Sequence, residues 1–263
     1  VSDGELGHDV ARVLGVLGGL VMGMALRRAA SQRTGSPLSP VATQIAGLSP
    51  VGWWRLGESS GTSLADSGSA GATGTLSGTA TLAQAGALTG VSDTALLLAG
   101  GSAAFTRIAA TQQQSAFGWI KTTDTDSTVG YDGDAALTLL GDTSGGIWHG
   151  FGVTGGKAEL RRYDATGSTW RLHTGAASVN DGAWHMIGYT YNNSTRAVVI
   201  YVDGATDYSG THASHQNQGG WSAVGRGYNA ADTFRGTVDE VAVFTTVLTA
   251  QNFADLWEKS RLG

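Results

Sequence analysis

The chain has 263 residues and a formal net charge of −5, and it contains 41 glycines but no cysteine. Without cysteine it has neither a disulfide framework nor a thiolate metal site. The acidic balance and the lack of a Lys/Arg-rich run argue against nucleic acid as a partner. Length and composition therefore predict one large β domain with an appendage.

The appendage comes first. Residues 1–33 predict a helix over about residues 4–31. Ser2 and Glu5 have the spacing of a capping box, with Ser2 as the N-cap. Acidic side chains at the start and arginines at the end also suit the helix dipole.

The middle of this segment, residues 10–26, is almost wholly apolar. It carries glycines at intervals of four, and each interior glycine costs about 1 kcal/mol relative to alanine. Such a helix needs a partner, which a stripe of small residues allows to approach closely. We therefore expect an assembly anchor formed by Gly15, Gly19, Leu20, Gly23 and Met24.

Three interpretations of this segment are open. A signal peptide is disfavoured, because the acidic residues precede the apolar run and the basic pair follows it. A transmembrane helix would be short, since residues 13–26 span about 21 Å against a hydrocarbon core of about 30 Å. Length and charge order favour the third, an anchor helix that packs into a protein assembly or self-associates, so we do not expect a membrane partner.

Residues 34–50 hold all three prolines of the chain. Together with serine, threonine and glycine they predict a linker of partly extended character. We expect it to end at Pro50.

From residue 51 onward, short runs rich in β-branched and aromatic residues alternate with glycine-rich turns. This pattern predicts a two-sheet sandwich. We expect strands over about residues 51–57, 72–77, 94–99, 103–109, 115–122, 127–131, 136–140, 147–154, 157–163, 168–173, 183–191, 196–202, 206–211, 221–226 and 234–245.

The last third of the chain carries the clearest motifs. They are WHMIGYTY at 184–191, YVDG at 201–204, GTVDEV at 236–241 and LTAQNFADLW at 248–257. Asp-Gly between two strands suits a tight hairpin, and Thr249 is a plausible N-cap for a closing helix, with Asn252 where a capping box prefers Glu.

This ordered set resembles the laminin G-like jelly-roll family of the concanavalin A-type sandwich, and WWRLGE at 53–58 and AFGWIK at 116–121 extend the resemblance over roughly residues 51–263. It implies an all-β, two-sheet antiparallel jelly roll with a short C-terminal helix. Residues Trp54, Trp119 and Trp184 lie in runs that resemble its core strands, so we expect them to be buried.

Other aromatics lie in less regular segments and are candidates for carbohydrate binding. A sugar stacks its C–H face on an aromatic ring while polar neighbours bond its hydroxyls. The candidates are Trp148, Trp170, Trp221, Arg226 and Tyr228, for each of which packing between the sheets is the competing interpretation.

The sequence offers little for catalysis. A hydrolase on this sandwich would need two carboxylates about 5–9 Å apart across a cleft. Asp239 and Glu240 are adjacent, so we expect them to face opposite sides of their strand. We therefore predict a non-enzymatic protein without a cofactor.

Calcium is the one metal that the resemblance implies. Many members of the family hold Ca²⁺ with an Asp of the first loop and the Asp of the Asp-Glu-Val strand, which here are Asp66 and Asp239. A further acidic position of the family reads Ala99-Gly100-Gly101. Alternatively, Asp66 caps a turn and Asp239 bonds a backbone amide.

An apolar N-terminal helix, a linker and a jelly roll together resemble accessory structural proteins of bacteriophage particles. We therefore expect a virion-surface protein that joins capsid or tail proteins through residues 1–33, forms a homo-oligomer and adheres to host-surface glycan. Two alternatives stay open, namely a secreted or membrane-anchored bacterial carbohydrate-binding module and a purely structural protein that stabilises the particle.

Overall fold

The computed structural model describes residues 38–90, 92–125, 137–143, 149–164, 169–214, 219–227 and 232–262. Residues from Ser39 onward form a compact unit. The predicted helix over 4–31, with its anchor residues Gly15, Gly19, Leu20, Gly23 and Met24, lies outside the described residues, as does the strand expected over 127–131. No helix in the described part is long and apolar enough to cross a membrane.

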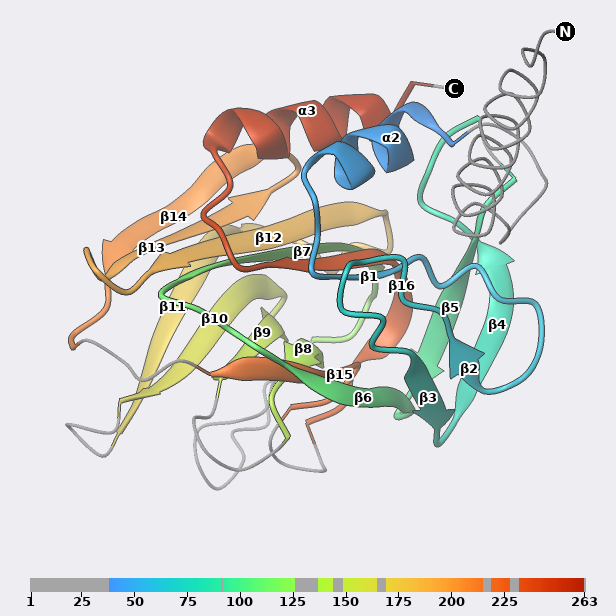
Figure 1. Ribbon diagram of the computed structural model, residues 1–263, viewed down its shortest axis with the longest axis horizontal. Helices are drawn as coiled ribbons and strands as arrows, with labels where there is room; N and C mark the ends of the chain where they lie inside the picture. Colours follow the sequence, from blue (N-terminus) through green and yellow to red (C-terminus); the bar gives the residue numbers. More distant parts are fainter. Residues whose placement is uncertain are drawn as a thin grey trace, which may run out of the picture. The chain divides into compact units, whose positions relative to one another are not determined.

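The described strands form two sheets of eight strands, in which every pairing is antiparallel (Figure 1). The first sheet has the order β14-β13-β12-β7-β16-β5-β4, with β1 also paired to β16. Its strands are β1 (Gly52–Trp54), β4 (Ala80–Ala85), β5 (Thr94–Ala99), β7 (Gln113–Lys121), β12 (His185–Asn192), β13 (Ala197–Val202), β14 (Ala205–Thr211) and β16 (Arg235–Phe244).

The second sheet has the order β11-β10-β9-β8-β15-β6-β3-β2. Its strands are β2 (Ser63–Leu64), β3 (Gly74–Ser77), β6 (Ser102–Ala109), β8 (Leu137–Gly141), β9 (His149–Thr154), β10 (Lys157–Asp164), β11 (Thr169–Ser178) and β15 (Gly220–Val224). The predicted all-β, two-sheet antiparallel jelly roll is confirmed. The sequence does not predict strands β2 and β4. β2 has only two residues, and β4 lacks the run of β-branched and aromatic residues that is typical of a strand.

The turn between β13 and β14 shows how local sequence sets the register. Asp203 and Gly204 have φ of 50° and 80°, and Val202 pairs with Ala205 across the turn. Positive φ at both central residues is what a two-residue hairpin turn requires, so the predicted Asp-Gly hairpin is confirmed.

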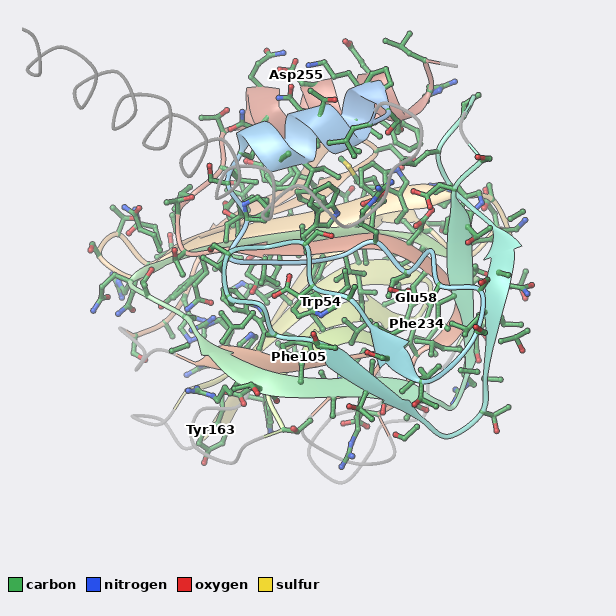
Figure 2. The ribbon with its side chains drawn as sticks, turned by 45° about the vertical axis from the view of Figure 1, so that its right-hand side comes forward. Trp54, Glu58, Phe105, Tyr163, Phe234 and Asp255 are labelled. Carbon is green, nitrogen blue, oxygen red and sulfur yellow. The ribbon has the colours of Figure 1, made fainter. Side chains whose placement is uncertain are left out.

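Most of the core lies between the sheets. Trp54 packs against Phe105 from the facing sheet, with ring centroids 4.1 Å apart (Figure 2). Trp54 and Trp119 are each 1% exposed, so their predicted burial is confirmed. Trp184 is only partly buried and packs at the edge of a second apolar cluster.

That second cluster lies on the outer face of the first sheet, beneath α2 (Pro40–Gly47) and α3 (Ala250–Ser260) (Figure 1). The prediction of a linker over 34–50 is therefore wrong for residues 40–47. Ser39 accepts a hydrogen bond from the amide of Ala42 as N-cap, and Pro40 stands in the first turn, where proline is favoured because its missing N–H is not needed.

The closing helix α3 forms as the sequence predicts. Thr249 and Asn252 make a reciprocal capping box, and Phe253 stacks on Tyr201 with centroids 3.9 Å apart. Gly188 allows this approach, because a Cβ there would lie 2.4 Å from the ring of Phe253.

At one side of the sandwich the two sheets meet edge to edge. Asp207 of β14 accepts hydrogen bonds from the amides of Ala176 (2.9 Å) and Ala177 (3.0 Å) of β11. Gly175 leaves room for this carboxylate, since a Cβ there would collide with it.

Candidate functional site

The outer face of the second sheet has a bare strip along β9. Phe151 and Val153 of this strand belong to the core, so alternation places Gly150 and Gly152 at the outward positions. Gly150 pairs with Arg161 and Gly152 with Glu159 on β10. Gly150 leaves a depression beside β10, whereas Gly152 is buried and the backbone of Leu137 fills the space beside it.

A hollow opens over Gly150. It is narrow, about 10 Å³, which is about the room of one water molecule. It therefore fits a single hydroxyl group rather than a whole sugar ring. Its lining residues come from β8, β9, β10, β11 and the loop after β15, and they are Thr138, His149, Gly150, Arg161, Trp170, Gly227 and Asp232.

Trp170 supplies the aromatic wall of this hollow. Its indole is half-buried, and it packs edge to face against Tyr163, its cross-strand partner, at 5.6 Å between centroids. An indole held by a neighbouring ring on a rigid strand can offer a flat surface beside the hollow.

Arg161 is held in place by a buried network. Glu159 accepts hydrogen bonds from Arg161 Nε (2.5 Å) and from the hydroxyls of Thr154 (2.9 Å) and Thr174 (2.5 Å). Arg161 Nη2 also donates to Thr154 Oγ1 at 2.8 Å. Both oxygens of Glu159 are thus committed, and the guanidinium is fixed at the wall of the hollow.

The predicted carbohydrate-binding residues do not all lie at the hollow. Trp170 lines the hollow, and Arg226 directly precedes Gly227 in its wall. Trp148 and Tyr228 lie outside the described residues. Thr138, Gly150, Arg161 and Asp232 were missed, although the alternating glycines of β9 were a signal in the sequence.

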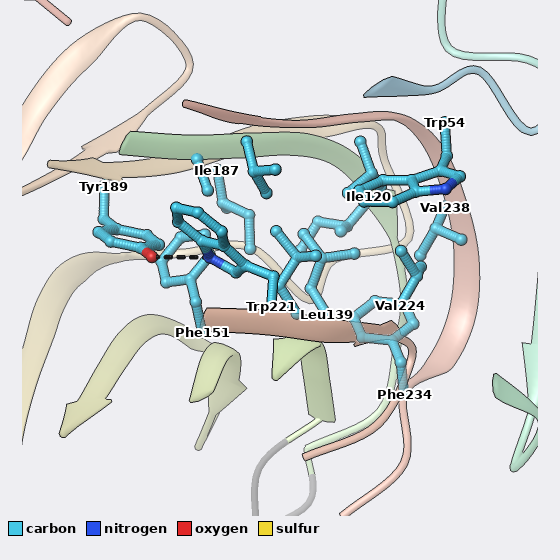
Figure 3. Packing of buried hydrophobic residues seen from close by; sticks show 14 of the residues in the cluster. Trp54, Ile120, Leu139, Phe151, Ile187, Tyr189, Trp221, Val224, Phe234 and Val238 are labelled. Atoms are coloured by element: carbon cyan, nitrogen blue, oxygen red, sulfur yellow. Dashed lines mark hydrogen bonds between the residues drawn. The ribbon is translucent and has the colours of Figure 1, made fainter. Parts of the chain in front are cut away.

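The prediction for Trp221 is wrong. Its indole is 0% exposed and donates a hydrogen bond to the hydroxyl of Tyr189 at 3.1 Å, between the sheets (Figure 3). A ring enclosed in this way cannot stack on a ligand, and the competing interpretation of inter-sheet packing holds.

The two carboxylates predicted to share calcium serve separate parts of the backbone. Asp66 accepts from the amides of Trp53, Gly68 and Ala72 at 2.6–2.7 Å, and Asp239 accepts from Ala87 N at 2.8 Å. Amide donors occupy the lone pairs of Asp66 that a cation would use, whereas Asp239 is bound through Oδ2 and its Oδ1 has no hydrogen-bond partner among the described residues. In the described ranges, no group of three acidic or histidine side chains could hold a metal ion. These residues do not fit a shared calcium site, and the turn-capping alternative is observed.

The expectation that Asp239 and Glu240 face opposite sides is also wrong. A bulge follows Asp239, and Glu240 adopts φ of 47°, so the alternation breaks. Asp239 reaches Ala87, and Glu240 accepts from the indole Nε1 of Trp53 at 2.5 Å. Both partners pack in the cluster beneath the helices.

Burial dominates the electrostatics of this acidic pair. It raises the pKa of Glu240 to about 7, although Arg55 Nε donates to its carboxylate at 3.1 Å. Burial and the neighbouring Glu240 raise the pKa of Asp239 well above its ordinary value. Arg55 also pairs with Asp93, so one cation serves two carboxylates.

Comparison with known proteins identifies similar structures, a curated relative and a family. Among solved structures, it is similar to domain 4 of AbnA, a GH43 extracellular arabinanase from Geobacillus stearothermophilus solved in complex with arabinotriose. The two are 18% identical, with a TM-score of 0.58, over 79% of this chain and 97% of that chain. The binding domain of botulinum neurotoxin serotype G matches at 14% identity and a TM-score of 0.55, over 80% of this chain and 50% of that chain.

A curated relative is the rat (Rattus norvegicus) sushi, von Willebrand factor type A, EGF and pentraxin domain-containing protein 1, which is 33% identical over 96 residues. The match covers 32% of this chain and spans 3% of that protein's length. A sequence profile described as the concanavalin A-like lectin/glucanases superfamily matches residues 99–254, which is more than half of the chain. The protein therefore belongs to the concanavalin A-like lectin/glucanase superfamily.

Proposed function

We propose that this domain is a non-enzymatic adhesion module that binds polysaccharide on the outer face of its second sheet. The observation that carries the proposal is the half-buried indole of Trp170 beside the hollow over Gly150. A sugar ring would stack on Trp170 and direct one hydroxyl into the hollow, where Arg161, Thr138 and Asp232 offer hydrogen bonds.

Two features support binding without catalysis. Both carboxylate oxygens of Glu159, a buried acid on β10, accept hydrogen bonds from Thr154, Arg161 and Thr174. The acidic pair with raised pKa values, Asp239 and Glu240, belongs to the other sheet. The similar arabinanase domain was solved with arabinotriose and the similar toxin domain is a binding domain, which fits the same kind of role.

The binding test uses a polysaccharide array that includes arabinotriose, probed with the full chain coupled as tetramers so that weak contacts add up. Trp170→Ala should lower affinity at least about tenfold, equivalent to ~1.4 kcal/mol. Gly150→Leu should fill the hollow and also abolish binding. The fold has room for that side chain at its base, because a Cβ on Gly150 meets nothing nearer than Thr138 Cγ2 at 3.6 Å.

Trp257→Ala is the matched control, since this tryptophan belongs to α3, against the first sheet. It should bind as wild type does. Melting curves establish that each variant is folded. Binding retained by both site variants, or lost equally in the control, would reject the site.

We further propose that the domain is displayed on the surface of a bacteriophage particle as a homo-oligomer, joined to capsid or tail proteins by residues 1–33. The small-residue stripe at Gly15, Gly19 and Gly23 supports this proposal, because a helix with that many glycines needs a packing partner. Display on a bacterial surface and a purely structural role in the particle are the competing proposals.

Deletion of residues 1–33 tests the display. The residues from Ser39 onward form a compact unit of their own, so the truncated chain should fold and melt as wild type does. It should no longer copurify with particles when it is expressed during infection. Incorporation at the wild-type level would contradict the anchor, and glycan binding by the truncated chain separates that outcome from failure of the binding site.

A further inference from the structure

A buried cation that pairs with no carboxylate of the described residues lies between the two sheets. Arg162 of β10 is 1% exposed, and its neighbours Leu160 and Tyr191 belong to the inter-sheet core. The guanidinium stacks on the Tyr191 ring at 4.0 Å and donates from Nη1 to the neutral amide oxygen of Gln114 at 3.1 Å. Its Nε and Nη2 find no acceptor in the part of the chain that the structure describes.

Within the described ranges, no carboxylate pairs with Arg162. Burial lowers the pKa of Arg162, and the opposing influences come from the phenols of Tyr191 and Tyr189. Burial raises the pKa of Tyr189 to about 12, so that phenol is neutral at ordinary pH. Arginine itself stays protonated in proteins, which leaves a full positive charge in the core.

His149, the cross-strand neighbour of Arg162, contributes two buried ring nitrogens. His149 pairs with Arg162 across β9 and β10, and its ring packs edge-on against Trp221 at 6.1 Å between centroids. Burial and then Arg162 lower its pKa to about 3, so the imidazole is neutral and carries one N–H. Neither ring nitrogen has a hydrogen-bond partner among the described residues. The carboxylate that influences His149, Asp142, already pairs with Arg107 at 2.8 Å.

We propose that Arg162 and His149 together bind a small monovalent anion, of the size of chloride or bromide, between the sheets. A water molecule could accept the free N–H groups but would leave the positive charge uncompensated, which is costly in a low-dielectric interior. One negative charge neutralises the guanidinium and accepts its donors. The packed surroundings, which include Trp221 and Phe151, restrict the ligand to a small ion.

The test compares melting of the full chain in sodium chloride, bromide and gluconate at equal ionic strength. Gluconate serves as an anion too large for the site. Chloride and bromide should raise the melting temperature saturably, by roughly 5–10 °C at a hundredfold excess over Kd. Arg162→Met should abolish the dependence on anion identity. Arg171→Met, which removes an exposed cation from the paired position on β11, should retain it.

A second measurement covers the case in which Arg162→Met does not fold. Crystals of the wild-type protein grown in bromide should give an anomalous peak within contact distance of Arg162 and His149. Equal melting temperatures in all three salts, or a crystal with only water at this position, would overturn the proposal.

Discussion

Glu240 combines a strained backbone with a buried carboxyl group. A non-glycine residue at φ of 47° is uncommon and costs of order 1 kcal/mol. Its side chain accepts hydrogen bonds from the Trp53 indole and the Arg55 guanidinium. These bonds connect β1 and the residue after it to β16. A single residue thus joins the beginning of the sandwich to its last strand.

The raised pKa of Glu240 makes its contribution to stability depend on pH. The folded state keeps the proton up to about pH 7, whereas the ordinary value is 4.5. The stabilisation is therefore fully present below about pH 4.5 and is lost as the pH rises through about 7. Relative to wild type, Glu240→Gln should gain unfolding free energy over this interval.

Urea unfolding of wild type and Glu240→Gln from pH 4 to 8 measures this difference. The subtraction removes opposing effects, such as that of His149, which are common to both proteins. Glu258→Gln, an exposed carboxylate on α3, controls for the loss of an acidic group. A wild-type-to-variant difference that stays flat across the interval would refute the assignment.

At the scale of elements, α2 shows how a short helix gains stability from its packing. Eight residues are too few for a helix to persist alone. Val41, Ala42 and Ile45 are buried against the first sheet, and Gln44 accepts a hydrogen bond from Lys259 of α3 at 2.5 Å. The two helices therefore cover one face together, although they are more than 200 residues apart in the chain.

Ile45→Ala tests whether α2 is integral to the domain. Ile45 is 0% exposed, so truncation should cost about 2–5 kcal/mol of unfolding free energy through lost burial and a residual cavity. Thr43→Ala, at an exposed position of the same helix, should change stability by less than about 0.5 kcal/mol. Chemical denaturation measures both, and equal small effects would mean that residues 40–47 behave as a linker after all.

At the scale of the molecule, local patterns in the sequence predict most strands and the closing helix. Composition does not reveal α2, because the prolines, serines and glycines of residues 34–50 predict an extended linker, although proline also suits the first helical turn. Trp170 and Trp221 both lie in short aromatic runs that predict strands. The structure places Trp221 in the core between the sheets and Trp170 at the hollow. Arg161, Asp232 and Gly150 converge on one hollow through strand register, which depends on pairings between distant segments and cannot be derived from neighbours in the chain.

The contact of Asp207 with β11 has a consequence for crowded copies of the protein. Strand β11 is the last strand of its sheet, and free amides on such a strand invite pairing with another molecule. Asp207 occupies the amides of Ala176 and Ala177 with a negative charge, so an approaching strand meets satisfied donors and electrostatic repulsion. Asp207 therefore disfavours strand pairing between crowded copies at this part of β11.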